Sequence, residues 1–225
     1  MWTKGDIVGM YDALIASSLT QLHLEFDAEQ LGQLNSYIAE IELWNPVYKL
    51  VGAGGEELIT KHIIDSLSAV DHIKGLLQAY EHPVLADLGS GAGLPGIPLA
   101  IALKGYSFTL VERMGRRVGF LNNALARCGL GDRVTVYDKD LSQVKGTFDL
   151  ITFRAFHPLY DILDQVAPIL SPQGVVCAYK GQMDSLVKEL EQVRTSCKSS
   201  WVEKTENLVV PYLDAQRLLC ILKKK

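Results

Sequence analysis

A glycine-rich stretch decides the fold of this chain, and it reads Ala86-Asp87-Leu88-Gly89-Ser90-Gly91-Ala92-Gly93-Leu94-Pro95-Gly96. It continues an apolar run at residues 83–88, which has the length of a buried strand. In a doubly wound α/β sheet, the loop after the first strand lies at the carboxyl edge, where ligands bind. Glycines there allow positive φ angles and let a ligand contact the backbone directly. Four glycines at this spacing therefore predict a ligand-binding loop rather than a merely tight turn.

Two cofactors fit the spacing of this loop. Gly91-x-Gly93-x-x-Gly96, followed by Glu112, matches a dinucleotide fingerprint, whereas Asp87-x-Gly89-x-Gly91-x-Gly93 matches the S-adenosylmethionine (SAM) loop of Rossmann-type methyltransferases. A pyrophosphate needs free N–H groups and no nearby carboxylate, but Asp87 flanks the loop and Pro95 removes one donor. SAM instead carries a cationic sulfonium and an ammonium, which a carboxylate attracts. The loop therefore favours SAM over NAD.

Charged side chains follow the next strands at the same edge of the expected sheet. Glu112 closes the second strand, where an acid accepts hydrogen bonds from the ribose hydroxyls of an adenosine. Asp140 follows the third strand and is placed to meet the adenine edge. Arg154 ends the fourth strand, and its guanidinium fork suits the SAM carboxylate or an RNA phosphate. The three acids Asp87, Glu112 and Asp140 together predict a site for an adenosine and a cation.

The rest of the chain alternates between strand and helix patterns after a helical start. Seven apolar runs are expected to be strands: 83–88, 107–112, 133–137, 148–153, 174–180, 204–210 and 217–222. Strands that alternate with helices indicate a mostly parallel seven-stranded sheet with helices on both faces, here a Rossmann-like SAM-dependent methyltransferase fold. Residues 1–80 show only helical spacing, with a capping box at Asp27 and Gln30. We expect a helical N-terminal extension at 1–80 that packs on a SAM-binding domain at 81–225.

The composition excludes several classes of protein. The chain has 225 residues, of which 48% are hydrophobic and 21% charged, and no run approaches the ~20 apolar residues of a membrane-spanning helix. Residues 1–6 lack the charged and apolar regions of a secretion signal, so a cytoplasmic location is expected. The four cysteines form no Cys-x-x-Cys pair, and they are expected to be small buried hydrophobes rather than metal ligands or disulfides. They are Cys128, Cys177, Cys197 and Cys220.

The net charge of −4 is unevenly distributed. Residues 1–80 hold 4 Lys/Arg and 11 Asp/Glu, whereas residues 81–225 hold 18 and 15. The sheet domain is therefore net positive, although some of its acids are assigned to the cofactor. This distribution excludes a nonspecific polyanion binder but is compatible with an enzyme that meets one folded nucleic acid through a local basic rim.

Several motifs occur in order beyond the glycine loop. They are Lys61-His62-Ile63-Ile64-Asp65-Ser66, Val111-Glu112, Gly115-Arg116-Arg117, Phe120-Leu121, Arg154-Ala155-Phe156, Tyr179-Lys180-Gly181-Gln182, and Val210-Pro211-Tyr212-Leu213-Asp214 with Arg217. With the Leu-Pro-Gly-Ile-Pro ending of the loop, they make the chain from about Trp44 to Ile221 resemble the glucose-inhibited division protein B family, bacterial 16S ribosomal RNA guanine-N7 methyltransferases. The chain departs from the family pattern at Pro46 and Lys49 and at Lys61, where the family typically has arginine.

This resemblance implies a reaction and a set of cofactor contacts. The reaction is methyl transfer from SAM to N7 of a guanine in 16S rRNA, either naked, in the 30S subunit or in an assembly intermediate. Its motif positions imply SAM contacts at Gly89, Leu94, Lys139, Asp140 and Arg154. No obligate protein partner and no membrane partner are evident.

The expected chemistry needs no proton carrier. Guanine N7 has a free lone pair and no proton, so an in-line SN2 attack needs no general base, and orientation alone can supply about 7–11 kcal/mol. The sequence shows no triad, metal cluster or paired carboxylates, and we assign no catalytic residue. Two alternatives stay open: a methyltransferase of a small molecule or protein, and a non-catalytic SAM- or nucleotide-binding regulatory module. NAD-dependent oxidoreduction ranks third.

The basic rim and the remaining motif residues complete the expectations. The candidates for RNA contact are Arg113, Arg116, Arg117 and Lys180. Phe153 and Phe156 are expected in the core, as is His62, which lies in an apolar helical stripe. Lys61, His62 and Asp65 fall on nearby turns of one helix, which could cover the cofactor as a lid.

Overall fold

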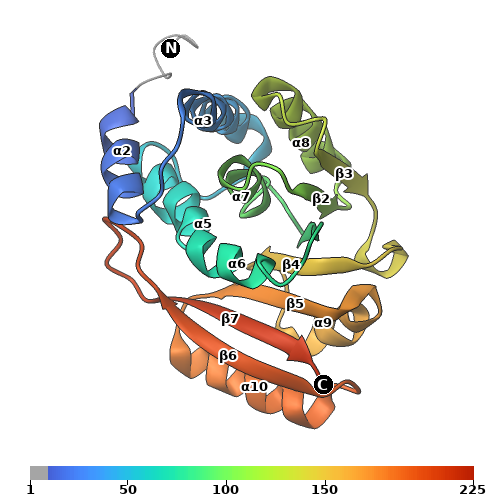
Figure 1. The fold of residues 1–225 in the computed structure, drawn as a ribbon. Coiled ribbons are helices and arrows are strands. Elements are labelled where there is room, and N and C mark those ends of the chain that lie inside the picture. Colours follow the sequence, from blue (N-terminus) through green and yellow to red (C-terminus); the bar gives the residue numbers. More distant parts are fainter. Residues whose placement is uncertain (1–9) are drawn as a thin grey trace.

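The computed structural model describes residues 10–225, and the centre of the fold is a seven-stranded sheet (Figure 1). The strands are β1 (Val84–Leu88), β2 (Ser107–Glu112), β3 (Val134–Asp138), β4 (Phe148–Arg154), β5 (Leu170–Lys180), β6 (Trp201–Leu208) and β7 (Arg217–Lys224). Their order is β3-β2-β1-β4-β5-β7-β6, and β1 to β5 are parallel to one another. Strand β7 is antiparallel to both β5 and β6. The mostly parallel sheet predicted from the sequence is thus confirmed.

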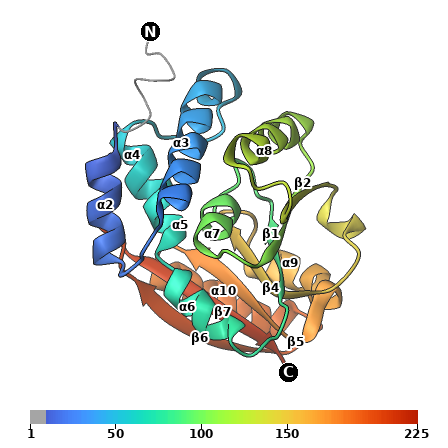
Figure 2. The same cartoon turned by 45° about the horizontal axis from the view of Figure 1, so that its top comes forward.

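Helices cover both faces of this sheet, as predicted (Figures 1 and 2). They are α2 (Asp12–Gln21), α3 (Ala28–Tyr48), α4 (Glu56–Leu58), η1 (Ile59–Ile64), α5 (Asp65–Leu67), α6 (Val70–Leu77), α7 (Gly96–Ala102), α8 (Gly115–Cys128), η2 (Leu141–Gln143), α9 (Leu159–Val166), η3 (Ala167–Ile169) and α10 (Met183–Ser196). Alternate strand residues point to opposite faces. Leu85 and Leu150 join a core with α2 to α8, whereas Ala86 and Ile151 join a second core with α9 and α10.

The N-terminal helices are tied directly to the sheet. Helix α3 begins at the predicted capping box, in which Asp27 Oδ1 accepts from the Gln30 N–H at 2.9 Å and Gln30 Oε1 accepts from the Asp27 N–H at 3.1 Å. The Gln30 amide also donates to the carbonyl of Ile101 in α7. The weaker apolar stripe expected at Ile7, Met10, Leu14 and Ser18 lies partly within the described residues, where Ser18 is buried and Met10 is exposed, whereas Ile7 and residues 1–6 lie outside them. Helices α2 to α6 therefore share one core with the sheet.

Two strands begin earlier than their sequence pattern indicates. Strand β5 starts at Leu170 rather than residue 174, because its first residues pair with β4 across an irregularity between Phe148 and Leu150. Edge strand β6 spans 201–208 rather than 204–210. Three of the four cysteines are buried, as expected, and Cys197 is half-buried. None of the helices in residues 10–225 has the length and apolar character needed to cross a membrane.

Candidate functional site

The glycine loop lies at the carboxyl edge of the sheet and is held by contacts from three directions. Gly89, Gly91 and Gly93 have φ angles of 63°, 59° and 88°, a region that residues with a Cβ rarely adopt. From above, the fully buried Tyr37 of α3 donates its hydroxyl to the carbonyl of Ala92 at 2.6 Å. The N-terminal helices therefore help to fix the loop itself.

Glu112, at the end of β2, fixes the loop from the side. Its Oε2 accepts from the N–H of Gly91 at 2.9 Å, and its Oε1 accepts from the N–H groups of Arg113 and Met114, also at 2.9 Å. The side chain is only 4% exposed, and Arg117 lies 3.6 Å from it. Charge-assisted bonds of this kind are stronger than neutral ones. Glu112 thus connects the loop, the strand and the start of α8.

Asp87 supports the loop from below and does not face the solvent. It is fully buried, and its carboxylate accepts hydrogen bonds from the Gly96 N–H at 3.2 Å and from the Thr152 hydroxyl at 3.2 Å. Burial raises the pKa of Asp87 to about 7, although these hydrogen bonds oppose the shift. We expected Asp87 to attract the cationic groups of a cofactor, but it lines neither cavity described below. Asp87 therefore anchors the glycine loop through Gly96.

The buried carboxyl of Asp87 predicts a characteristic pH dependence of stability. Its pKa is about 3.8 in the unfolded chain and about 7 in the folded protein, so between these values only the folded state keeps the proton. The free energy of unfolding of wild type should therefore fall relative to Asp87→Asn as pH rises from 4 to 7, by on the order of 4 kcal/mol. Chemical denaturation across this range tests it. The exposed Asp132→Asn variant, as control, should follow wild type, and a constant gap between wild type and Asp87→Asn would contradict the prediction.

Two adjoining cavities open at the carboxyl edge of the strands. Their volumes are about 810 Å³ and about 540 Å³. Both are lined by Gly89, Arg117, Ala155, Phe156 and His157. The Phe156 ring is so close to Gly89 that a Cβ at residue 89 would lie 2.1 Å from it. The segment 155–157 after β4 thus forms the wall between the cavities, and Ala155 has a φ of 49° there.

The smaller cavity combines three acids and three bases with an apolar surface. Glu112 closes one strand end, and Lys139 and Asp140 follow the next. Asp140 caps η2 by accepting from the Ser142 N–H at 3.1 Å, and it accepts from Arg113 at 3.0 Å. The hydrogen bonds of Ser142 and Arg113 lower the pKa of Asp140. The apolar part of the lining is Val111, Met114, Leu141 and Ile162. A flat base with a polar edge suits such a cavity.

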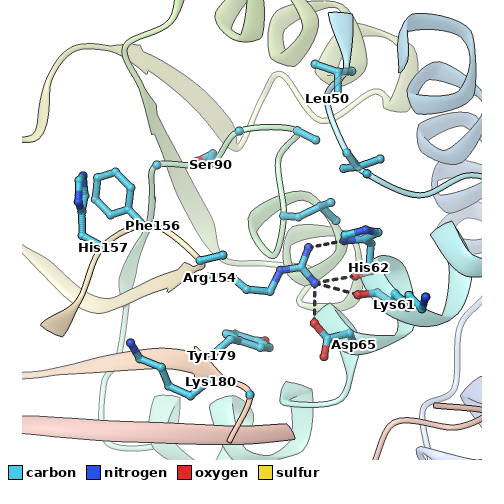
Figure 3. A pocket seen from close by; sticks show the side chains of 18 of the residues that line it. Leu50, Lys61, His62, Asp65, Ser90, Arg154, Phe156, His157, Tyr179 and Lys180 are labelled. Carbon is cyan, nitrogen blue, oxygen red and sulfur yellow. Dashed lines mark hydrogen bonds and ion pairs between the residues drawn. The ribbon is translucent and has the colours of Figure 1, made fainter. Parts of the chain in front are cut away.

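The larger cavity contains two arginines that share one carboxylate, and Figure 3 shows the contacts of one of them, Arg154. Asp65 is 2% exposed; its Oδ2 accepts from Arg154 at 2.5 Å and its Oδ1 from Arg217 at 2.9 Å. Arg154 also donates to the carbonyl of Lys61 at 3.3 Å and contacts the Nδ1 atom of His62 at 3.0 Å. Two positive charges against one negative charge leave an excess positive charge in this wall. We call Asp65, Arg154 and Arg217 the arginine clamp.

A π-helical turn forms the side of the larger cavity next to the arginine clamp. The sequence predicts one continuous helical stripe from Leu58 to Val70, but Ile59–Ile64 form a π-helical turn between α4 and α5. Such wide turns are frequent at functional sites. His62, expected in the core, instead lines the larger cavity with Lys61 and Asp65. Burial, followed by the charge of Arg154, lowers the pKa of His62 to about 4, so the ring is neutral at pH 7.

Most of the other predicted site residues line one of the two cavities. Those that line a cavity are Gly89, Gly91, Leu94, Glu112, Arg113, Arg117, Lys139, Asp140, Arg154 and Lys180. Gly93 packs against Ile97, and the exposed Arg116 lines neither cavity. Phe153 is buried as expected, whereas Phe156 is not a core residue but a cavity wall. Tyr37, Arg217 and Glu189 are not among the residues predicted above for the site, although Arg217 lies in a quoted motif, and Asp65 is predicted only as part of the helix that could cover the cofactor.

Solved structures share this fold at low sequence identity. A SAM-dependent O-methyltransferase from Thermotoga maritima aligns with a TM-score of 0.51 and 16% identity, covering 72% of this chain and 71% of that one. A tRNA (m1A58) methyltransferase from Aquifex aeolicus aligns with a TM-score of 0.51 and 14% identity, covering 70% and 69%. These similarities concern the fold alone, which is that of SAM-dependent methyltransferases.

Sequence relatives are closer and cover nearly the whole chain. Ribosomal RNA small subunit methyltransferase G of Alteromonas mediterranea is 34% identical over 214 residues, which are 94% of this chain and 96% of the relative. The protein of the same name from Nitrosococcus oceani is also 34% identical over 214 residues, 94% of each chain. The family model described as rRNA small subunit methyltransferase G matches residues 30–220. The chain therefore belongs to the rRNA small subunit methyltransferase G family.

Proposed function

We propose that this protein is a SAM-dependent methyltransferase that methylates N7 of one guanine in 16S ribosomal RNA, in the cytoplasm. Membership of the family supports the reaction class and the RNA substrate. The observation that carries the proposal is the pair of adjoining cavities at the glycine loop, one with acids and bases in balance and the other with an excess of bases. Carboxylates at strand ends can accept from the ribose hydroxyls of a nucleoside cofactor, and an anionic polymer requires an excess of positive charge.

The smaller cavity fits the adenosine part of SAM. Glu112 and Asp140 place acceptors at successive strand ends, and the apolar lining offers contact to the faces of a base. A Cβ at Gly91 would meet nothing closer than 3.8 Å, so the backbone of the loop is accessible. When bound, SAM supplies an electrophilic methyl group on a sulfonium. We assign Gly89, Gly91, Leu94, Glu112, Lys139 and Asp140 to its binding.

The larger cavity fits an RNA nucleotide beside the methionine end of SAM. It is lined by Lys61, Arg117, Arg154, Lys180 and Arg217, against the two acids Asp65 and Glu189. This excess of bases stands in a chain whose net charge is −4. The arginine clamp would bind a carboxylate or a phosphate, because guanidinium groups recognise either through paired hydrogen bonds. Arg113, exposed at the start of α8, extends the basic surface.

The residues of this site orient the reactants rather than move protons. Guanine N7 bears no proton, and the neutral His62 is engaged with Arg154, so it serves as a positioning residue. Holding N7 in line with the methyl group accounts for catalysis, since orientation alone can supply about 7–11 kcal/mol.

The absence of a proton carrier predicts the behaviour of a His62→Asn variant. Asparagine keeps an acceptor for Arg154 but cannot act as a base near neutral pH. We expect turnover at saturating SAM to fall by less than about tenfold, with a pH profile parallel to that of wild type, because only positioning is perturbed. Rates between pH 6 and pH 9 provide the test. A loss of several orders of magnitude that varies with pH would identify His62 as a proton carrier.

One labelling experiment tests the proposed function. The protein is incubated with radiolabelled SAM and small ribosomal subunits, or naked 16S RNA, from a strain that lacks the methylation. Borohydride reduction and aniline cleavage then locate N7-methylguanine in the RNA. Label at one guanine of 16S RNA is the expected result. Label only on protein or small molecules, or binding of SAM without any transfer, would instead indicate one of the two alternative functions.

A further inference from the structure

The wall of the larger cavity contains an ion pair between Lys180 and Glu189, and the reaction outlined above gives no role to the pairing itself. Lys180 Nζ donates to Glu189 Oε2 at 2.6 Å, and the two side chains are only 14% and 19% exposed. Both residues line the cavity. Removing two charges from water costs free energy. Apolar residues of similar volume often stabilise a fold as well as such an ion pair does. This pair therefore requires an explanation beyond stability.

Three elements hold the pair in a fixed orientation. Lys180 is the last residue of β5, at the edge where Arg154 ends β4, and Glu189 lies in α10. Glu189 Oε2 also accepts the N–H of Leu159, the first residue of α9, at 3.0 Å. In Figure 3, Lys180 lies across the cavity from Leu50. The pair is thus a rigid part of the wall rather than a mobile surface contact.

The pair retains hydrogen-bonding capacity on both partners. Within residues 10–225, Glu189 Oε1 accepts no hydrogen bond, and Lys180 donates only to Glu189. The wall thus presents a donor beside an acceptor. The other acid of the cavity, Asp65, uses both of its oxygens to accept hydrogen bonds from Arg154 and Arg217. Among the described residues, Glu189 is therefore the acid lining this cavity with an oxygen left for a ligand.

A guanine base has the complementary pattern. Its O6 acceptor lies beside the N1–H donor, whereas adenine presents an N6 amino donor beside the N1 acceptor. We propose that the Lys180–Glu189 pair selects guanine, with the ammonium donating to O6 and the carboxylate accepting from N1–H. This contact leaves N7 unengaged. The inference rests on the proposed function and names the residues that choose its target base.

The first test uses the wild-type protein and altered RNA. Small subunits are reconstituted with 16S RNA in which the methylated guanosine is replaced by inosine, adenosine or 2-aminopurine riboside, and kcat/KM is measured for each. Inosine keeps O6 and N1–H and loses only the 2-amino group, so it should react within about threefold of guanosine. Adenosine and 2-aminopurine, which lack both groups, should react about 10- to 100-fold more slowly, the range of a bidentate contact.

The second test uses variants with matched controls. Glu189→Gln keeps an acceptor for the Leu159 N–H but adds a donor, so the ratio of kcat/KM for guanosine to that for adenosine should fall by about tenfold or more. Lys180→Met should lower the same ratio. Glu191→Gln and Lys188→Met, at exposed positions of the same helix, should leave it unchanged. Affinity for S-adenosylhomocysteine should stay at the wild-type level in all four variants.

The outcomes separate this inference from the proposed function. If wild type methylates guanosine but treats inosine like adenosine, or if Glu189→Gln keeps the wild-type ratio, the pair does not read the base and the proposed function stands. If wild type labels no guanine of 16S RNA, both fall. The series of altered bases decides the question even where a variant fails to fold.

Discussion

Replacing Asp65 with alanine is expected to lower the free energy of unfolding by about 3 kcal/mol and to reduce methyl transfer at least about 100-fold. Asp65 is the buried partner of both Arg154 and Arg217, so its removal leaves two poorly solvated guanidinium groups without a counter-charge. Misplacement of those groups by about 1 Å is enough to disrupt the alignment of reactants. Chemical denaturation and single-turnover assays on RNA would measure the two effects.

A neighbouring ion pair provides the control for Asp65. Glu57 pairs with Lys61 at 2.6 Å on the same helical segment, but both side chains are largely exposed. Glu57→Ala should therefore change stability and turnover little, because solvent screens such pairs. Asp65→Asn keeps one acceptor and should fall between wild type and Asp65→Ala in both measurements. Equal stabilities of Glu57→Ala and Asp65→Ala would show that the arginine clamp is not a buried charge network.

The fold and the position of the site could be predicted from sequence because their signals are local. The capping box at Asp27, the apolar runs of the strands and the spacing of the glycines each act over a few residues. The carboxyl edges of successive parallel strands then bring Gly89, Glu112, Asp140 and Arg154 to one side of the sheet. No long-range information is needed for that step.

The arginine clamp could not be predicted in the same way. Asp65 lies 89 residues before Arg154 and 152 before Arg217, and its carboxylate meets them only after α5 docks on the sheet. The π-helical turn at 59–64 also changes which side chains face the cavity, so the helical stripe misplaces His62 in the core. Contacts of this kind depend on tertiary packing, for which periodicity carries no signal.

The burial of Asp87 could have been predicted from the alternation of side chains along the strand. In β1, Asp87 and Leu85 are two residues apart and so share a face, which α7 covers at Gly96. A carboxylate on that face is buried under the loop instead of pointing to the ligand. Although Asp87 is close in sequence to the glycines of the loop, the pleat of the strand turns its side chain away from both cavities.

Gly89→Ala is expected to weaken cofactor binding at least about tenfold by displacing the wall between the cavities. The residue has a φ of 63°, where a Cβ costs about 1–2 kcal/mol. The new Cβ would also lie 2.1 Å from the Phe156 ring, and overpacking of this kind typically costs about 1–3 kcal/mol more. Because Phe156 lines both cavities, its displacement reshapes each of them. Isothermal titration with S-adenosylhomocysteine should show an affinity at least about tenfold weaker, equivalent to about 1.4 kcal/mol.

Two further variants separate backbone strain from the collision with Phe156. Gly129 ends α8 with a φ of 64°, and a Cβ there would meet nothing within 4 Å, so Gly129→Ala carries the strain alone. It should lose about 1–2 kcal/mol of stability and bind the cofactor product normally. Adding Phe156→Ala to Gly89→Ala removes the collision, and the double variant should regain stability relative to Gly89→Ala. If Gly89→Ala and Gly129→Ala behave alike, the ring moves aside freely and the wall between the cavities is not rigid.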